Sequence, residues 1–372
     1  MDDLGFIMLP IPTVSQNKSK IAPKKMFKFR SLFLLGGGAL GAKLYFQGGV
    51  NHHAPDMSNK TVLITGGNSG IGRETARELY RLKANVIITG RDEAKAAKLI
   101  KQLDKPSANQ QPLKFYQVDF EDLSQIKEFT EKIKKDHGRI DILVNNAGHN
   151  GRYRLTKDGV ESTMAVNHLA PVYLTSELVP LLKESSEARV VTVSSLAHRG
   201  QGLNISAGLE PDFDNYWTQT LNKKHQKYNW TQTYPQSKLA NVLFTKGLQR
   251  FYDQKKKDGE WGDGRLKAVS LHPGVVMTDM FRPFRKKYEW FWIFETVCGP
   301  IWWLLWKDEF EGAQTTLYCC LAPFAKLTAG EYYANCAIGD SSPQANDVGN
   351  VQTCWEVTNS KLKELTGDSV FA

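Results

Sequence analysis

From residue 60 onward, the chain alternates short runs rich in β-branched residues with longer stretches of helical periodicity. Strands are expected within 60–66, 85–90, 115–120, 140–148, 189–195 and 268–274, and helices within 73–83, 92–103 and 121–129. Helices that alternate with strands indicate parallel strands joined by crossovers. The pattern therefore predicts an α/β fold with a single doubly wound parallel sheet and helices on both faces. Because no repeat or long linker interrupts this pattern, we expect one domain over 57–372 that ends in a helix at 355–372.

Composition and charge exclude some classes of function. The 372 residues are 41% hydrophobic and 23% charged, as in an ordinary globular protein. No His or Cys cluster has metal-ligand spacing, so we predict no metal site. The net charge is +9, but residues 1–50 contribute +5 of it. A nucleic-acid-binding protein would carry such charge on its folded domain, so we expect no nucleic-acid partner.

Residues 1–56 form a separate basic and apolar N-terminal segment. Residues 18–30 are basic and contain no acid, and an apolar run of about a dozen residues precedes Lys43. A membrane span needs about 20 apolar residues, although a lysine can extend its charge to the interface. A membrane anchor, a targeting segment and a disordered tail all remain open. The basic lead favours the mitochondrial inner membrane, with the lead in the matrix if 31–50 span it. The endoplasmic reticulum is the alternative.

The sequence TGGNSGIG at 65–72 lies between an expected strand and an expected helix. Gly66 would allow a tight turn, Gly70 the close approach of a pyrophosphate, and Gly72 close packing of helix on strand. The helix N-terminus would then face the phosphates. The motif predicts a nucleotide site, and a plain glycine turn is the alternative. Its cofactor-binding residues would be Gly66, Asn68, Ser69, Gly70, Ile71 and Gly72.

Arg91 follows the second expected strand, where an NAD-binding protein usually carries an acid. An arginine suits a 2′-phosphate, so the sequence favours NADP(H). A solvated surface arginine is the alternative, and the adjacent Asp92 leaves NAD(H) open.

Two further motifs lie at the ends of expected strands. Asp119 could accept a hydrogen bond from the adenine amine, or it could cap the helix that follows. Asn146, Ala147 and Gly148 lie at the carboxyl end of a hydrophobic strand, the edge at which open α/β sheets bind ligands. These small residues would allow close approach of a cofactor.

Tyr234 and Lys238 are four residues apart, so on a helix they share one face. A nearby ammonium favours the phenolate and lowers a tyrosine pKa from its usual value of about 10. Such a tyrosine can exchange a proton with a substrate. Ser195, at the end of a strand, could hydrogen-bond a substrate oxygen. A chance Tyr–Lys pair on a helix is the alternative.

Together with AVNHLA, which contains Asn167, and HPGVVMT at 272–278, these motifs resemble the short-chain dehydrogenase/reductase superfamily. The phrases VNHLAPVYLT, QSKLANVLFTK and GEYYANC resemble its retinol-dehydrogenase-like group. KYNWTQTYPQSKLA and GPIWWLLWK look most like the mitochondrial member of that group. The resemblance covers roughly residues 45–365. It implies a Rossmann-like fold and NADP(H)-dependent hydride transfer between nicotinamide and a lipophilic carbonyl or alcohol.

The resemblance also implies roles for single residues. Tyr234 would exchange the proton with the substrate, and Lys238 would lower the pKa of Tyr234 and bind the nicotinamide ribose. Ser195 would position the substrate oxygen, and Asn167 would hold a water that links Lys238 to solvent. The nicotinamide carboxamide and the pyrophosphate region would be contacted by Val276 and Thr278.

Two departures from the family pattern support an alternative function. The segment between Ser195 and Tyr234 is unusually long and polar. Pro235 directly follows the tyrosine, and because proline restricts the residue before it, we expect the helix to begin nearer Tyr234. Either feature could weaken catalysis. The alternative is an accessory subunit of a mitochondrial membrane complex that keeps the fold.

Residues 288–306 contain five of the nine tryptophans. The resemblance makes 282–311 a substrate lid. Two glutamates and Pro300 argue against a span, and the basic residues at 282–287 are typical of a helix at a membrane interface. A lid that touches membrane, a lid or core alone, and an oligomer interface or span remain open. The expected partners are a lipophilic small molecule, a membrane surface, and a membrane complex or a second copy.

Overall fold

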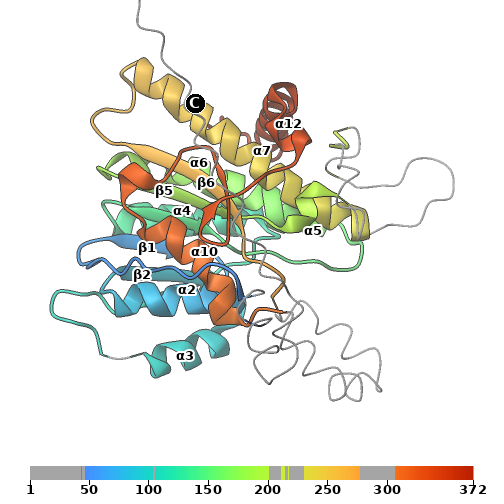
Figure 1. Ribbon diagram of the computed structural model, residues 1–372. Helices are drawn as coiled ribbons and strands as arrows, with labels where there is room; N and C mark the ends of the chain where they lie inside the picture. The colour runs from blue at the N-terminus through green and yellow to red at the C-terminus, as the bar shows by residue number, and fades with distance from the viewer. Residues whose placement is uncertain are drawn as a thin grey trace, which may run out of the picture.

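The computed structural model describes Lys43 and residues 47–103, 105–200, 211–213, 217, 230–276 and 306–371. Within these residues, one sheet runs in the order β3-β2-β1-β4-β5-β6-β7-β8 (Figure 1). Its strands are β1 Thr61–Ile64, β2 Asn85–Gly90, β3 Lys114–Gln117, β4 Ile142–Asn145, β5 Ala188–Val193, β6 Leu266–His272, β7 Tyr332–Ala334 and β8 Ala337–Ile338. All neighbours are parallel except β7 and β8. The predicted α/β fold with a doubly wound parallel sheet is confirmed.

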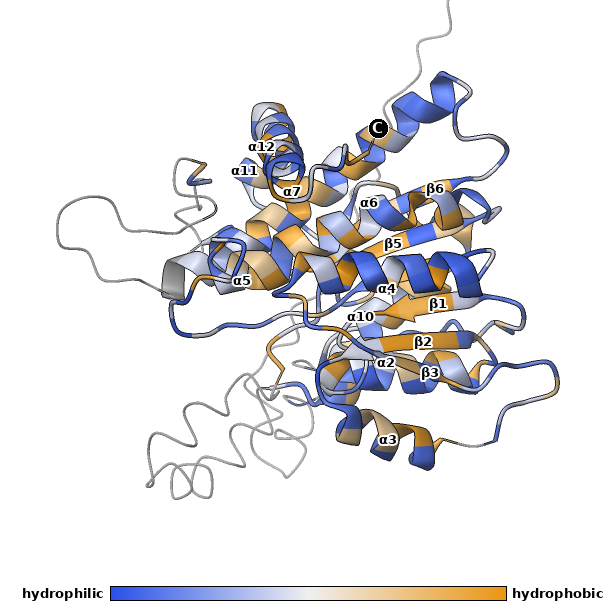
Figure 2. Ribbon diagram, turned by 180° about the vertical axis from the view of Figure 1, so that it is seen from behind, coloured by the Kyte–Doolittle hydropathy of each residue, from blue (hydrophilic) through white to orange (hydrophobic). Residues whose placement is uncertain are grey.

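Helices cover both faces of the sheet. Figure 1 shows α2 and α10 in front of the strands, and Figure 2, seen from behind, shows α4 and α6 there instead. Successive strand residues point to opposite faces, and the core follows this rule. Leu63 belongs to the core beneath α4, α6 and α7, whereas Val62 and Ile64 belong to the core beneath α2, α3 and α10. The helices are α2 Gly70–Arg81, α3 Glu93–Gln102, α4 Leu123–Asp136, α6 Ala170–Lys183, α7 Trp230–Lys257 and α10 Glu309–Leu321.

The C-terminal helix α12, Val348–Thr366, packs on α7. A Cβ built on Gly247 of α7 would lie 2.7 Å from the Trp355 ring, so this glycine allows the close contact. The expected bounds of 355–372 were wrong at both ends. The Asp347 side chain accepts from the Asn350 amide and starts the helix early, and Gly367, with a φ of 74°, ends it. The remaining short elements are α5 Ser162–Met164, the π turn η1 Ala165–Leu169, the 3₁₀ turns η2 Leu196–Arg199 and η5 Phe324–Lys326, and α11 Pro343–Asn346.

The segment between β6 and α10 begins and ends at one place. Val276 and Lys307 form a parallel bridge, and the Lys307 amide donates to the Val275 carbonyl at 2.9 Å. Asp308 and Glu311 then form a capping box that starts α10. The last residues of the expected lid, 309–311, therefore belong to α10. Residues 277–305 lie outside the described residues.

Lys43 joins the N-terminal segment to the start of α10. Its ammonium donates to the Glu311 carboxylate at 2.7 Å and to the Trp306 carbonyl at 3.2 Å. Further along, the Asn51 amide donates to the Gln314 side chain at 3.1 Å. Among the helices that the structure describes, none has the length and apolarity needed to cross a membrane. Of residues 31–50, for which a span was one of the open alternatives, all but Lys43 and 47–50 lie outside the described residues.

Candidate active site

The glycine-rich turn after β1 brings the chain close to the end of β4. Gly66 and Gly70 have φ values of 65° and 55°, which glycine adopts without strain. A Cβ built on Gly72 would lie 2.4 Å from both the Asn146 side-chain nitrogen and the Gly66 carbonyl oxygen. Asn146 donates to the Thr65 carbonyl at 2.8 Å and to the Gly66 carbonyl at 3.4 Å. The two strand ends are thus bound together where the turn begins.

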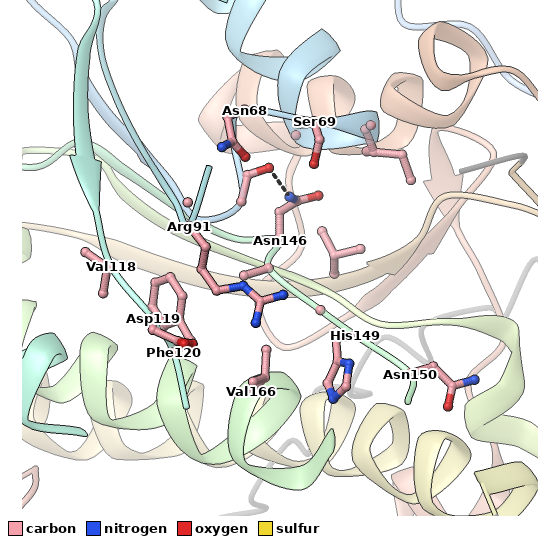
Figure 3. Close-up of a pocket in the computed structure, with 18 of the residues that line it drawn as sticks. Asn68, Ser69, Arg91, Val118, Asp119, Phe120, Asn146, His149, Asn150 and Val166 are labelled. Carbon is pink, nitrogen blue, oxygen red and sulfur yellow. Dashed lines mark hydrogen bonds between the residues drawn. The ribbon is translucent and has the colours of Figure 1, made fainter. Parts of the chain in front are cut away.

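A cavity of about 480 Å³ opens at this edge of the sheet (Figure 3). Most of the predicted site residues line it. They are Gly66, Asn68, Ser69, Gly70, Ile71, Gly72, Arg91, Asp119, Asn146, Ala147, Gly148, Tyr234 and Lys238. The cavity lies at the N-terminus of α2, where backbone amides favour an anion. Within the described ranges, no three His, Cys, Asp or Glu side chains could hold a metal ion together.

Arg91 and Asp92 have different surroundings. The Arg91 guanidinium points into the cavity (Figure 3), is 63% exposed, and lies 3.5 Å from the Glu121 carboxylate. Asp92 caps α3 instead, and its carboxylate accepts from the Lys95 amide at 3.0 Å. The Asp92 carbonyl accepts from Asn68 at 2.8 Å. The Asp92 carboxylate, the group that could have bound the ribose of NAD(H), is therefore engaged at the start of a helix.

Asp119 lines the cavity and does not cap α4. The cap is Asp122, whose carboxylate accepts from the Ser124 amide at 2.9 Å. The Asp119 carboxylate accepts from the Glu121 amide at 3.1 Å and so holds its own loop. Of the two readings of Asp119, the helix cap was wrong, and the adenine contact stays a prediction.

Tyr234 and Lys238 lie together at the base of the cavity. The Lys238 ammonium is 5.7 Å from the centre of the Tyr234 ring and donates to the Val193 carbonyl at 3.0 Å. Burial lowers the pKa of Lys238 to about 8. Burial also raises the pKa of Tyr234, and a hydrogen bond with Ser195 partly offsets the rise. The net direction is opposite to the expected one, because the loss of water outweighs the influence of the neighbours.

Asn167 and Ser195 adjoin this pair. A Cβ built on Gly148 would lie 3.4 Å from both the Asn167 side-chain oxygen and the Lys238 ammonium, so these two groups are near neighbours. Asn167 lies in the π turn, accepts from the His149 amide at 2.7 Å and donates to Ser237 at 2.9 Å. The Ser195 hydroxyl accepts from the Ala197 amide at 3.2 Å, which starts η2. Both side chains are fixed by the backbone around them.

Val276 lies at the rim of the site, since a Cβ built on Gly312 would be 2.7 Å from Val276 and 3.2 Å from Ile71. Thr278 lies outside the described residues. Pro235 does not delay the helix, because α7 begins at Trp230 and continues through it. The expected start nearer Tyr234 was wrong, and helix packing outweighs the local restriction imposed by proline.

The described residues of the polar insertion contact the domain at Trp217, Asp212 and Phe213, the last of which packs against the core. The Trp217 carbonyl accepts from the Glu161 amide at 2.7 Å, and the Trp217 ring stacks on His168 with centroids 6.1 Å apart. The Asp212 amide donates to Gln236 at 3.4 Å. The insertion therefore reaches both the π turn and the start of α7.

Several cavity residues were not predicted from the sequence. Lys95 lies in the first turn of α3 and lines the cavity together with Arg91. Its position four residues after Arg91 could have identified it as a cavity residue. His149 directly follows the NNAG motif, and its ring bonds the Ser162 hydroxyl at 3.2 Å. Val118, Phe120, Val166 and Pro273 also line the cavity and carry no chemical signal in the sequence.

Comparison with known proteins agrees with this geometry. A family model described as short chain dehydrogenase matches residues 60–207. Retinol dehydrogenase 14 of Mus musculus is 33% identical, over 88% of this chain and 95% of that protein. Retinol dehydrogenase 13 of Homo sapiens is 34% identical, over 91% of this chain and 95% of that protein.

Solved structures share the fold. A crystal structure of an uncharacterized protein from Mycobacterium paratuberculosis has a TM-score of 0.60 and 28% identity, covering 84% of this chain and 98% of that one. The RhlG/NADP active-site complex from Pseudomonas aeruginosa, at 20% identity, has a TM-score of 0.53 and covers 75% and 95%. The chain therefore belongs to the short-chain dehydrogenase/reductase superfamily of oxidoreductases, within its retinol-dehydrogenase-like group.

Proposed function

We propose that this protein uses NADP(H) to transfer a hydride between nicotinamide and a lipophilic carbonyl or alcohol, with Tyr234 as the general acid or base. The observation that carries the proposal is the meeting of Tyr234, Lys238 and Ser195 beside a glycine-lined cavity. A proton donor there would lie next to a bound dinucleotide.

The cavity residues fit a dinucleotide. Side chains at Gly72 or Gly66 would collide with Asn146, Ala147 or the turn itself, so these glycines let the α2 turn pack on the end of β4 and form the wall of the cavity. Arg91 and Lys95 give the adenosine end two cations. The neighbouring carboxylate, Asp92, is engaged as a helix cap. Glu121, 3.5 Å from Arg91, also lines the cavity, but Arg154 pairs with it as well. The two cations therefore support a 2′-phosphate and hence NADP(H).

The proposed chemistry follows from the buried groups. Bound nicotinamide would supply or accept the hydride. Tyr234 would donate its hydroxyl proton to the carbonyl oxygen during reduction and accept a proton from the alcohol during oxidation. Ser195 would orient that oxygen and stabilise the phenolate. The Lys238 ammonium would stabilise the same phenolate, and Asn167 would hold the surrounding backbone in place.

One edge of the domain, where Lys43 contacts Trp306, supports a lipophilic substrate and a membrane surface. Lys43, which ends the apolar N-terminal run, contacts Trp306, which ends the aromatic-rich stretch. Next to them, Val275 and Phe310 are 51% and 54% exposed. We infer that this edge faces lipid, at the mitochondrial inner membrane because of the basic lead, with the endoplasmic reticulum as the alternative.

The test is a titration of the purified protein with NADPH and NADH, monitored by fluorescence. Turnover of all-trans-retinal and a medium-chain aldehyde then follows, for wild type, Tyr234→Phe and the control Tyr116→Phe. The Tyr116 hydroxyl bonds Asp136 outside the cavity. We expect tight NADPH binding by all three proteins and loss of turnover in Tyr234→Phe alone.

Other outcomes have distinct meanings. NADPH binding by wild type without turnover of any carbonyl would indicate an accessory subunit that keeps its nucleotide. Absence of nucleotide binding would refute the enzyme proposal. Equal turnover in Tyr234→Phe and wild type would show that Tyr234 is not the proton donor.

A further inference from the structure

His198 lies directly behind the catalytic serine and has no role in the function proposed above. It is fully buried in the 3₁₀ turn η2. Its Nδ1 is 2.7 Å from the Ser195 carbonyl oxygen. Its Nε2 accepts a hydrogen bond from the Ser342 backbone amide at 3.1 Å. One imidazole therefore connects the serine to the N-cap of α11, far along the chain.

These two hydrogen bonds determine the tautomer of the ring. A backbone N–H can only donate, so Nε2 must be unprotonated. A carbonyl oxygen can only accept, so Nδ1 must carry the proton. Burial lowers the pKa of His198 to about 4, which keeps the ring neutral at physiological pH. The ring is therefore held as the neutral Nδ1–H form, a donor to Ser195.

The packing around the ring leaves it one orientation. The Tyr332 ring lies against it with centroids 4.7 Å apart, and His272 lies on Tyr332 at 5.9 Å. His272 accepts from the Gly274 amide at 3.0 Å, beside the cavity-lining Pro273. The charged neighbour that acts on His198 is Arg199.

We propose that His198 is a positioning residue, which fixes the Ser195 backbone through its Nδ1–H and thereby the direction of the Ser195 hydroxyl. Ser342, 144 residues further along the chain, thus helps to orient the active-site serine through this histidine. The hydroxyl has little freedom to compensate, because it accepts from the Ala197 amide and bonds Tyr234. For its effect on turnover, this inference rests on the proposed function.

A matched pair of substitutions separates the two hydrogen bonds. His198→Asn places an amide nitrogen near the position of Nδ1 and keeps a donor to Ser195. His198→Gln places an amide oxygen near the position of Nε2 and keeps the acceptor for Ser342, but loses that donor. We expect kcat to fall about 10- to 100-fold in His198→Gln, as for a small misplacement of a reacting group. His198→Asn recovers most of this loss, and the Kd for NADPH changes less than about twofold in either variant.

A double-mutant cycle with Ser195→Ala distinguishes positioning from a structural role. If His198 acts through the serine hydroxyl, His198→Gln has no further effect on kcat once that hydroxyl is absent. An equal loss in both backgrounds would overturn the proposal, as would equal kcat in His198→Gln and His198→Asn.

The tautomer of His198 can be measured without relying on turnover. In protein labelled with ¹⁵N-histidine, the resonances absent from His198→Asn belong to this ring, and we expect the neutral Nδ1–H pattern. An Nε2–H pattern would overturn the proposal whatever the kcat of the variants. If wild type shows this tautomer but reduces no carbonyl, the proposed function fails while the hydrogen-bond assignment stands.

Discussion

The ammonium of Lys238 lies 5.7 Å from the ring centre of Tyr234 at the edge of the cavity, where the lysine is buried and the tyrosine half-buried. Burial acts on them in opposite directions, since it lowers the pKa of the lysine and raises that of the tyrosine. Both residues are thereby displaced toward their neutral forms. A bound ligand that carries negative charge or hydrogen-bond acceptors would favour the charged lysine.

The buried Lys238 gives the unliganded protein a pH-dependent stability. Its pKa is about 8 in the folded protein, below the usual 10.5 of a lysine, so the unfolded chain binds more protons between these limits. The unfolding free energy should therefore rise with pH from about 8 to 10.5 more steeply in wild type than in Lys238→Met. Urea unfolding at several pH values checks this, with the exposed Lys132→Met as control. Parallel curves for wild type and Lys238→Met would contradict it.

Arg91 should determine the preference between the two nicotinamide cofactors. We expect Arg91→Ala to weaken NADPH binding about 10- to 100-fold, because a charge-assisted hydrogen bond contributes about 1.5–3 kcal/mol. NADH binding should change little. Arg265→Ala, an exposed arginine paired with Glu187 outside the cavity, should leave both affinities unchanged. An equal loss of NADH binding in Arg91→Ala would show that the arginine does not read the phosphate.

Asp92 should matter for stability rather than for cofactor choice. Asp92→Ala removes the cap of α3 and should cost about 1 kcal/mol of unfolding free energy. Asp92→Asn keeps a capping oxygen and should recover most of that loss. Chemical denaturation measures both, and the ratio of NADPH to NADH affinities should be the same in all three proteins. A marked shift of that ratio in Asp92→Asn would show that the Asp92 carboxylate contacts the cofactor.

Gly72 should tolerate no side chain. A Cβ there would lie 2.4 Å from the Asn146 amide nitrogen and the Gly66 oxygen, so Gly72→Ala should abolish detectable NADPH binding and lower the melting temperature. Gly138→Ala is the matched control, since a Cβ at Gly138 meets nothing within 4 Å. Fluorescence titration and thermal unfolding check both. Full NADPH affinity in Gly72→Ala would show that the turn can open.

Buried histidines should make the protein sensitive to mild acid. Burial lowers the pKa of His168 to about 3 and that of His272 to about 4, from the usual 6.5 of a histidine. Stability from their neutral forms is present above pH 6.5 and is lost as pH falls toward these folded values. The unfolding free energy should therefore decrease between pH 6.5 and 4, less steeply in His168→Gln. An identical slope in that variant would exclude His168 as a cause.

The sequence predicted what depends on local pattern. The six expected strands and the glycine turn carry their periodicity and residue types in consecutive positions, and all of them appear where expected. The strands β7 and β8 were missed, because two or three residues give no alternation. The early start of α12 was missed because Gly349 and Asn350 resemble a loop, whereas the Asp347 cap overrides them.

The finer features of the site depend on residues that are distant in sequence. Whether Asp92 or Arg91 faces the cavity depends on which of them caps α3. Whether the pKa of Tyr234 is raised or lowered depends on how far the fold keeps water from its hydroxyl, which a Tyr–Lys spacing does not reveal. The contact between His198 and Ser342 joins residues 144 positions apart. Pairings of this kind have no local signature.

The bridge between Val276 and Lys307 has a further consequence. Val276, just after β6, and Lys307, just before α10, are held side by side, so the length of chain between them does not set the distance between β6 and α10. Closing a longer stretch between two fixed ends costs little additional free energy. The sheet and α10 can therefore keep their arrangement when the number of residues between positions 276 and 307 changes, so the fold should tolerate insertions and deletions there.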